Sequence, residues 1–244
     1  MYRKVKLNYA TLIFSVLLSS ACSAAGSAIE PHFNKDNQSS AFFDNALALN
    51  SASDFLSALE KTWDYPSDLK HKKLGNKTVS SCQRLKKHIN DGFHAAKASE
   101  HAFVSAQSVI CSMWEYMGKF KSYKISHMNK LSLNKGFANL APARFALLIS
   151  NDQIKKAEAA SSWNNVSKIK EVKPHSKVQS TYYDHSGSIQ RLTLMAKGDY
   201  NADGIEDQLF FMENSVEGGS YSSTKAYIIT RLTANGPIKL LKEF

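Results

Sequence analysis

A run of acidic and amide side chains at alternate positions lies near the C-terminal end of the sequence. Asp199, Asn201 and Asp203 each supply a side-chain oxygen. Gly204 permits a sharp turn, and Asp207 follows four residues after Asp203. Calcium takes six to eight oxygen ligands, and alternate positions of a tight loop can direct several oxygens at one point. The spacing predicts a calcium site with five ligands from the chain: Asp199, Asn201, Asp203, Asp207 and the carbonyl of Ile205. The alternative is a metal-free turn, which Asp, Asn and Gly also favour.

The same segment resembles the calcium loop of integrin-type FG-GAP and VCBS repeats, which has the pattern Asp-x-Asn/Asp-x-Asp-Gly-x-x-Asp. In those families the loop joins two strands and binds calcium, so the resemblance implies a strand on each side of it. An EF-hand fits less well, because its twelfth position is Phe210 here instead of Glu. Family members carry several such loops and this chain carries one, which favours a clip within a small sheet over a propeller.

Two cysteines, Cys82 and Cys111, remain once Cys22 is assigned to the N-terminal export segment discussed below. An even pair in an oxidising compartment predicts one disulfide, Cys82–Cys111. Such a bridge would stabilise the fold by about 3.5 kcal/mol on the chain-entropy estimate. Two buried free thiols are the alternative. Neither cysteine lies in a Cys-x-x-Cys motif, so redox catalysis is not expected.

The short motifs of the common catalytic sites do not occur in the sequence. It has no His-Glu-x-x-His, Gly-x-Ser-x-Gly, P-loop or Gly-x-Gly-x-x-Gly segment. The closest set of histidines is His88, His94 and His101, and Gly92 interrupts it. We therefore expect no zinc site and a protein that is not an enzyme. A hydrolase whose site is assembled from residues distant in sequence is the alternative.

The first 21 residues have the parts of a bacterial secretory signal. Three basic residues precede an apolar run and small residues that end at Ala21. The apolar run is too short to cross ~30 Å of hydrocarbon. Cys22 then occupies the place of a lipid-bearing cysteine, and residues 18–22 resemble a lipobox, which implies a lipoprotein anchored at Cys22. Ordinary cleavage, giving a soluble periplasmic protein, is the alternative. Residues 22–40 are small and polar and predict a flexible tether.

Charge is unevenly distributed along the chain. The formal net charge is +10, and it falls to +7 once the three basic residues of the signal are removed. Residues 60–135 hold fourteen Lys and Arg against six Asp and Glu, whereas residues 184–217 hold two against seven. In a cell envelope, a basic surface favours an acidic protein partner or anionic lipid and makes nucleic acid an improbable partner. A solvated, Lys-rich surface without a partner is the alternative.

Apolar residues recur at helical spacing in the first half of the chain. Helices are expected over residues 41–63, 79–90 and 99–120, the last with Ser99 as its N-cap, and a further helix is expected from Pro142. The lysine-rich residues 71–77 read as a loop.

From about Ser167 the apolar period changes from 3.6 to 2, which predicts strands. These are residues 177–183, 188–196, 208–213, 225–232 and 238–242. Helices followed by strands predict an α+β fold. We expect a helical region over 41–165 with one disulfide, and an antiparallel β region over 166–244 with the calcium-type loop.

These features together favour a non-enzymatic protein of the periplasm that binds another protein. An exported, mid-sized, charged chain with one disulfide and no catalytic motif resembles, in general class, the periplasmic immunity proteins that neutralise antibacterial effectors of type VI secretion, such as lipases or wall hydrolases. A calcium-stabilised structural or adhesion-like envelope lipoprotein is the alternative function.

Overall fold

The structure is a computed structural model that describes residues 27–244. The predicted signal peptide (residues 1–21), Cys22 and the first part of the predicted tether lie outside the described residues. None of the helices in residues 27–244 is long and apolar enough to cross a membrane.

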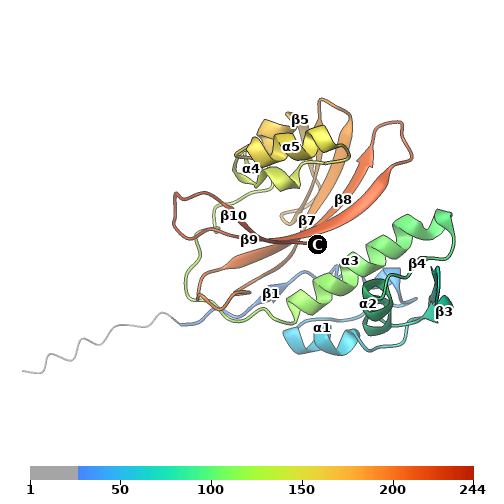
Figure 1. Ribbon diagram of the computed structural model, residues 1–244. Helices are drawn as coiled ribbons and strands as arrows, with labels where there is room; N and C mark the ends of the chain where they lie inside the picture. Colours follow the sequence, from blue (N-terminus) through green and yellow to red (C-terminus); the bar gives the residue numbers. More distant parts are fainter. Residues whose placement is uncertain (1–26) are drawn as a thin grey trace, which may run out of the picture.

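The described chain has an α+β fold in which helices cover both faces of one antiparallel sheet (Figure 1). This confirms the predicted fold class. The helices are α1 (Ala52–Ala58), α2 (Cys82–Asn90), α3 (His101–Met117), α4 (Phe137–Leu140), α5 (Asn151–Ala159) and α6 (Trp163–Val166). The strands are β1 (His32–Phe33), β2 (Ser67–His71), β3 (Gly75–Val79), β4 (His94–Ala95), β5 (Ile169–Pro174), β6 (Gln179–Asp184), β7 (Ser188–Gly198), β8 (Asp207–Val216), β9 (Ser222–Thr230) and β10 (Lys239–Glu243).

The large sheet has the strand order β10-β9-β8-β7-β6-β5, and β1 pairs with β7 beyond the end of β6. β8 lies in the middle and carries the uninterrupted apolar run Leu209–Met212, all of it buried. A strand alternates its side chains between the two faces of its sheet, so a continuous apolar run is typical of a strand covered on both faces.

The two faces contribute to two separate hydrophobic clusters. Leu209 and Phe211 pack with α1, α2 and α3 on one face. Phe210 and Met212 pack with α4 and α6 on the other. Figure 1 shows α4 and α5 on one side of the sheet and α1 to α3 on the opposite side. The sheet is therefore the shared core of the molecule, and the expected division at residues 165 and 166 does not separate two independent cores.

Several predicted elements of the first half differ from the structure. The helix expected over 41–63 is only the seven-residue α1, since a bend and irregular backbone occupy residues 44–50. The helix expected from Pro142 is a single 3-10 turn (Ala143–Phe145), and the backbone becomes extended at Ala146. Ser99 lies in a 3-10 turn (Ala98–Glu100) ahead of α3 and is not its N-cap. Helical periodicity overestimates helix length here because buried irregular segments also contribute apolar side chains to the core.

Other parts of the first half are strands that were not expected. Residues 71–77, predicted as a loop, include the ends of β2 and β3, which pair as a hairpin, and β4 joins β2 as a third strand. At the N-terminal end β1 pairs with β7 and Phe33 is 9% exposed, so the folded part begins inside the predicted tether. The side chains of β2 and β3 are mostly exposed, so these strands lack the apolar signal on which strand prediction depends.

The predicted strands of the second half agree with the structure in position and direction. Each lies within β6 to β10 or overlaps it by most of its length, and all are antiparallel to their neighbours. Only β5 was not predicted. It is a charged edge strand with one buried residue, Ile169, and such strands lack the alternating apolar pattern.

Candidate functional site

The predicted calcium loop joins the end of β7 to the start of β8, as the resemblance implied for its position. Ala202 (φ 65°) and Gly204 (φ 81°) both adopt the left-handed backbone conformation. Two such residues in close succession turn the chain sharply enough to bring the segment after Gly204 back beside Asp199. Gly204 accommodates this without cost, whereas Ala202 does not, because its Cβ crowds the backbone there.

The first three side chains of the loop accept hydrogen bonds from the loop's own backbone. The Asp199 carboxylate is buried and accepts the N–H groups of Asp203 (3.2 Å) and Gly204 (2.7 Å). Asn201 and Asp203 are exposed. The Asp203 carboxylate accepts from the Ile205 N–H at 2.8 Å. These bonds are the turn-forming contacts that Asp and Asn make without a metal.

Asp207 is the exception, because one of its oxygens has no partner. Its side chain is fully buried, and Oδ2 accepts the Tyr200 N–H at 2.9 Å. Oδ1 is buried and accepts no hydrogen bond of normal geometry within residues 27–244, although the buried Thr230 hydroxyl of the directly opposed residue in β9 acts to lower the pKa of Asp207. Burial raises the pKa of the Asp207 carboxyl to about 6, and the nearby Asp203 carboxylate adds to that rise. A buried carboxylate oxygen without a partner is costly and needs an explanation, of which a bound cation is one.

The residue types and spacing of the loop are those of a calcium site, but its side chains are not grouped around one point. Within residues 27–244, no three His, Cys, Asp or Glu side chains are grouped so as to hold a metal ion. The bridge between Ile205 and Ile125 uses the Gly204 carbonyl and the Glu206 N–H, and not the Ile205 carbonyl that was expected as a ligand.

The loop also fixes the linker that crosses from the helical side to the second half of the chain. Lys121 and Asp199 exchange both backbone hydrogen bonds, at 2.9 and 2.8 Å. Lys124 and Ile125 donate to the Gly204 carbonyl, and Glu206 donates to the Ile125 carbonyl. Sequence reasoning missed this contact, because residues 120–126 carry no signal of pairing with a loop about 80 residues away.

The last residue of the loop before β8, Glu206, is a buried acidic residue. Glu206 is 1% exposed and accepts a hydrogen bond from Gln208 at 2.7 Å. Burial, followed by the adjacent Glu206 carboxylate, raises the pKa of Tyr123 to about 12. Tyr123 therefore stays protonated at neutral pH and can donate to Glu206. The ligand spacing in the sequence excluded Glu206 from the predicted calcium ligands and gave no signal that its side chain is buried.

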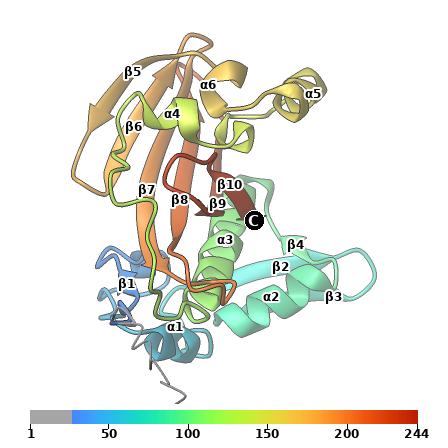
Figure 2. The same ribbon diagram turned by 90° about the vertical axis from the view of Figure 1, so that its left-hand side faces the viewer.

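A second candidate site, besides the loop, is the hairpin formed by β2 and β3, which projects beyond α2 (Figure 2). Its turn is fixed by the His71 ring, whose Nδ1 accepts the N–H groups of Lys73 (3.1 Å) and Leu74 (3.0 Å). Leu74 at the tip is 60% exposed. The hairpin is therefore held in a defined conformation although most of its side chains contact solvent.

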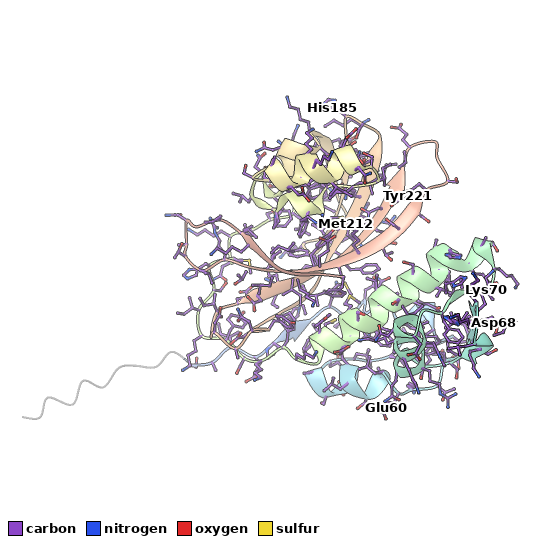
Figure 3. All side chains as sticks on the ribbon, in the orientation of Figure 1. Glu60, Asp68, Lys70, His185, Met212 and Tyr221 are labelled. Carbon is purple, nitrogen blue, oxygen red and sulfur yellow. A yellow bond between two sulfur atoms is a disulfide. The ribbon has the colours of Figure 1, made fainter. Side chains whose placement is uncertain are left out.

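The hairpin carries a concentrated positive charge. Its four lysines are exposed, and none of them forms an ion pair with another residue in 27–244: Lys70, Lys72, Lys73 and Lys77. The single carboxylate of the hairpin, Asp68, accepts a hydrogen bond from Thr78 at 2.7 Å. Figure 3 shows Asp68 and Lys70 at this end of the molecule, far from Met212 in the interior.

The predicted disulfide is present and supports the base of the hairpin. Cys82 and Cys111 are fully buried, with an S–S distance of 2.05 Å, and they join the first turn of α2 to the middle of α3. Leu69 of β2 and Val79 of β3 pack into the same cluster. The bridge thus stabilises the framework from which the hairpin extends.

Comparison of the chain with known protein families, with characterised proteins and with solved structures found no match. Fold, charge and site geometry therefore carry the functional argument.

Proposed function

We propose that this protein binds and neutralises a partner protein in the cell envelope and does so without catalysis, most simply as an immunity protein against a secreted antibacterial lipase or wall hydrolase. The observation that carries the proposal is the projecting β2–β3 hairpin, with an exposed leucine at its tip and four exposed lysines that form no ion pair with residues 27–244. An apolar residue at the tip of a positively charged hairpin is suited to a partner with an acidic surface beside a small apolar depression.

The hairpin is suited to binding because it is ordered before a partner arrives. The His71 contacts fix its turn, and the Cys82–Cys111 bridge and the Leu69 packing fix its base. A preorganised element loses little conformational entropy on association. Unpaired lysines also raise the rate of encounter with an acidic surface.

The test is a competition between sibling cells. Deleting the gene should make cells sensitive to neighbours that secrete the effector, and the wild-type gene should restore protection. The triple variant Lys70→Glu, Lys72→Glu, Lys77→Glu should fail to protect. The control variant Lys130→Glu, Lys155→Glu, Lys168→Glu changes the net charge equally at exposed, unpaired positions elsewhere, and it should protect normally. Deletion cells as resistant as the wild type would contradict the immunity function.

A second function, a calcium-stabilised structural or adhesion-like envelope lipoprotein, is favoured by the unpartnered Asp207 oxygen in a loop that fixes the linker. In this function calcium strengthens the junction between the two halves of the chain, and the exposed surface contacts cell wall or matrix. It is tested by the attachment of cells to matrix with calcium and with chelator. Attachment that depends on calcium in the wild type, and is lost in Asp203→Ala, would favour this function over neutralisation.

A further inference from the structure

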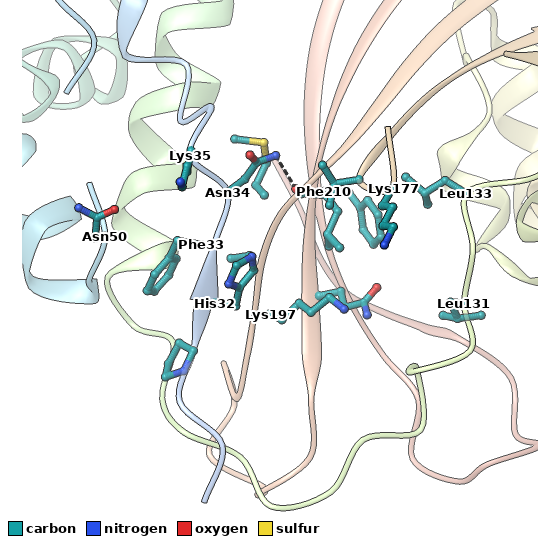
Figure 4. A pocket seen from close by; sticks show the side chains of 16 residues that line it. His32, Phe33, Asn34, Lys35, Asn50, Leu131, Leu133, Lys177, Lys197 and Phe210 are labelled. Atoms are coloured by element: carbon teal, nitrogen blue, oxygen red, sulfur yellow. Dashed lines mark hydrogen bonds between the residues drawn. The ribbon is translucent and has the colours of Figure 1, made fainter. Parts of the chain in front are cut away.

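A cavity of about 780 Å³ lies where β1 and β6 meet the same edge of β7 (Figure 4). β6 pairs with β7 as far as Thr193, and β1 takes over that edge at Ala196. The register of β7 against β8 shifts between Leu194 and Ala196. The gap between the two strands, together with this irregularity, leaves an opening over β8. Its volume is within the range of sites for small organic ligands.

The floor of this cavity is apolar. Phe210 of β8 is 1% exposed, and Leu133 of the linker is 8% exposed. Leu194 and Val178 are also part of the apolar lining. The Asn34 amide donates to the Leu194 carbonyl at 3.0 Å, which holds the segment after β1 against β7. An apolar ligand segment placed here would be removed from water on several sides.

The walls are basic and include no carboxylate. Lys177 lies on the β6 side, and Lys197 lies beside His32, its partner in the β1–β7 pairing. Lys35 is the third lysine of the lining. None of the three lysines forms an ion pair with a residue in 27–244, and no Asp or Glu lines the cavity. Uncompensated positive charge beside an apolar floor matches a ligand with one anionic end and one apolar end.

We propose that this cavity binds a single-chain anionic amphiphile, a fatty carboxylate or an alkyl phosphate. The chain lies against Phe210, Leu133 and Leu194, and the anionic head group is held by Lys177 and Lys197. This site is on the large sheet, whereas the basic hairpin belongs to the small sheet, so the inference does not depend on the proposed neutralisation of a partner.

Calorimetric titration of the mature chain with monomeric decanoate tests the proposal. We expect saturable binding with one ligand per chain, and affinity that rises about fourfold per added methylene from octanoate to decanoate, as burial of each CH₂ contributes. Decanol, which keeps the chain and lacks the charge, should bind more weakly. Decyl phosphate, compared with decanoate, identifies which anionic head group is preferred.

The double variant Lys177→Gln, Lys197→Gln should weaken decanoate binding roughly tenfold and leave decanol unchanged. The matched control Lys70→Gln, Lys77→Gln removes the same charge from the hairpin and should bind decanoate like the wild type. Absence of saturable decanoate binding, or equal weakening in both double variants, would overturn the site. Sedimentation with phosphatidylglycerol vesicles distinguishes a monomeric ligand in the cavity from a membrane surface. If both double variants lose vesicle binding equally, and no chain binds monomeric decanoate, the lysines attract anionic lipid in general and the proposed cavity site is overturned.

Discussion

At the scale of single residues, the burial of Asp207 depends on residues far from it in the sequence. The spacing of Asp199, Asn201, Asp203 and Asp207 is visible in the sequence, and so is the need for Gly204 at the turn. The sequence does not show that Asp207 is fully buried opposite Thr230 of β9, because this burial depends on the pairing of β8 with β9. Burial raises the pKa of this carboxyl to about 6, and a cation beside Oδ1 would lower that pKa because it favours the ionised form.

We expect calcium to stabilise the folded chain through this loop. A ligand that binds only the folded state at a hundredfold its Kd adds about 2.7 kcal/mol, which corresponds to a melting shift of roughly 5–10 °C for a domain of this size. Asp203→Ala should abolish the shift and leave the fold intact in chelator, since Asp203 is exposed and lies outside the core. Thermal unfolding in calcium and in chelator measures both. Equal melting temperatures of the wild type in the two buffers would mean that the loop is only a turn.

A second residue-scale prediction concerns Glu243 near the C-terminus. Its carboxylate accepts two hydrogen bonds from Arg144, at 2.7 and 3.0 Å, and one from Lys225. Burial raises the pKa of Glu243, but the hydrogen bonds from Arg144 and Lys225 lower it by a larger amount, so the pKa is below its usual value. A lowered pKa in the folded state means stability that is present above the unfolded pKa of ~4.3 and is lost as pH falls through the folded pKa.

Glu243→Gln should therefore lower the free energy of unfolding by about 1 kcal/mol at pH 7, because the ion pairs are partly exposed. The difference between the wild type and the variant should shrink as pH falls below about 4 and vanish below the folded pKa of Glu243. Urea unfolding at several pH values measures the difference. A gap of the same size at pH 3 and pH 7 would show that the substitution acts through packing and not through charge.

At the scale of elements, the disulfide was predictable and the helices around it were predictable in part. Cys82 and Cys111 lie on apolar faces of two expected helices, and both helices exist with shifted ends. The capping signal Ser150-x-x-Gln153, which starts α5, is present in the sequence and was overlooked. The β2–β3 hairpin was not predictable from hydropathy, since only Ser67, Leu69 and Val79 of its strands are buried.

Removing the disulfide tests the stability of these elements together. Cys82→Ala with Cys111→Ala should lower the free energy of unfolding by about 3.5 kcal/mol, because the unfolded chain regains the freedom of a closed loop. Unfolding in denaturant measures it, with the oxidised and reduced wild type as a matched comparison. If the reduced wild type unfolds at the same denaturant concentration as the oxidised protein, α2 and α3 are held by packing alone.

At the scale of the whole molecule, the large sheet joins the helical first half of the chain and the strands of the second half in one core. The helices of the first half supply both outer layers, and the strands of the second half supply the layer between them. The change in apolar period near Ser167 predicted the strands but not this arrangement, because the crossing of the chain from one face to the other is made by a linker without a regular pattern. The basic surfaces that carry the functional proposals lie at the outside of this shared core.

The central claim, neutralisation by stoichiometric binding, is tested most directly by titrating the purified chain into the secreted lipase or wall hydrolase against which the gene protects cells, and measuring the activity of that enzyme. We predict that activity falls linearly to its minimum at an equimolar ratio. The triple variant Lys70→Glu, Lys72→Glu, Lys77→Glu should need at least about tenfold more protein for the same inhibition, and the matched triple variant at Lys130, Lys155 and Lys168 should inhibit like the wild type. Undiminished enzyme activity at about a tenfold excess of the wild-type chain would contradict the claim.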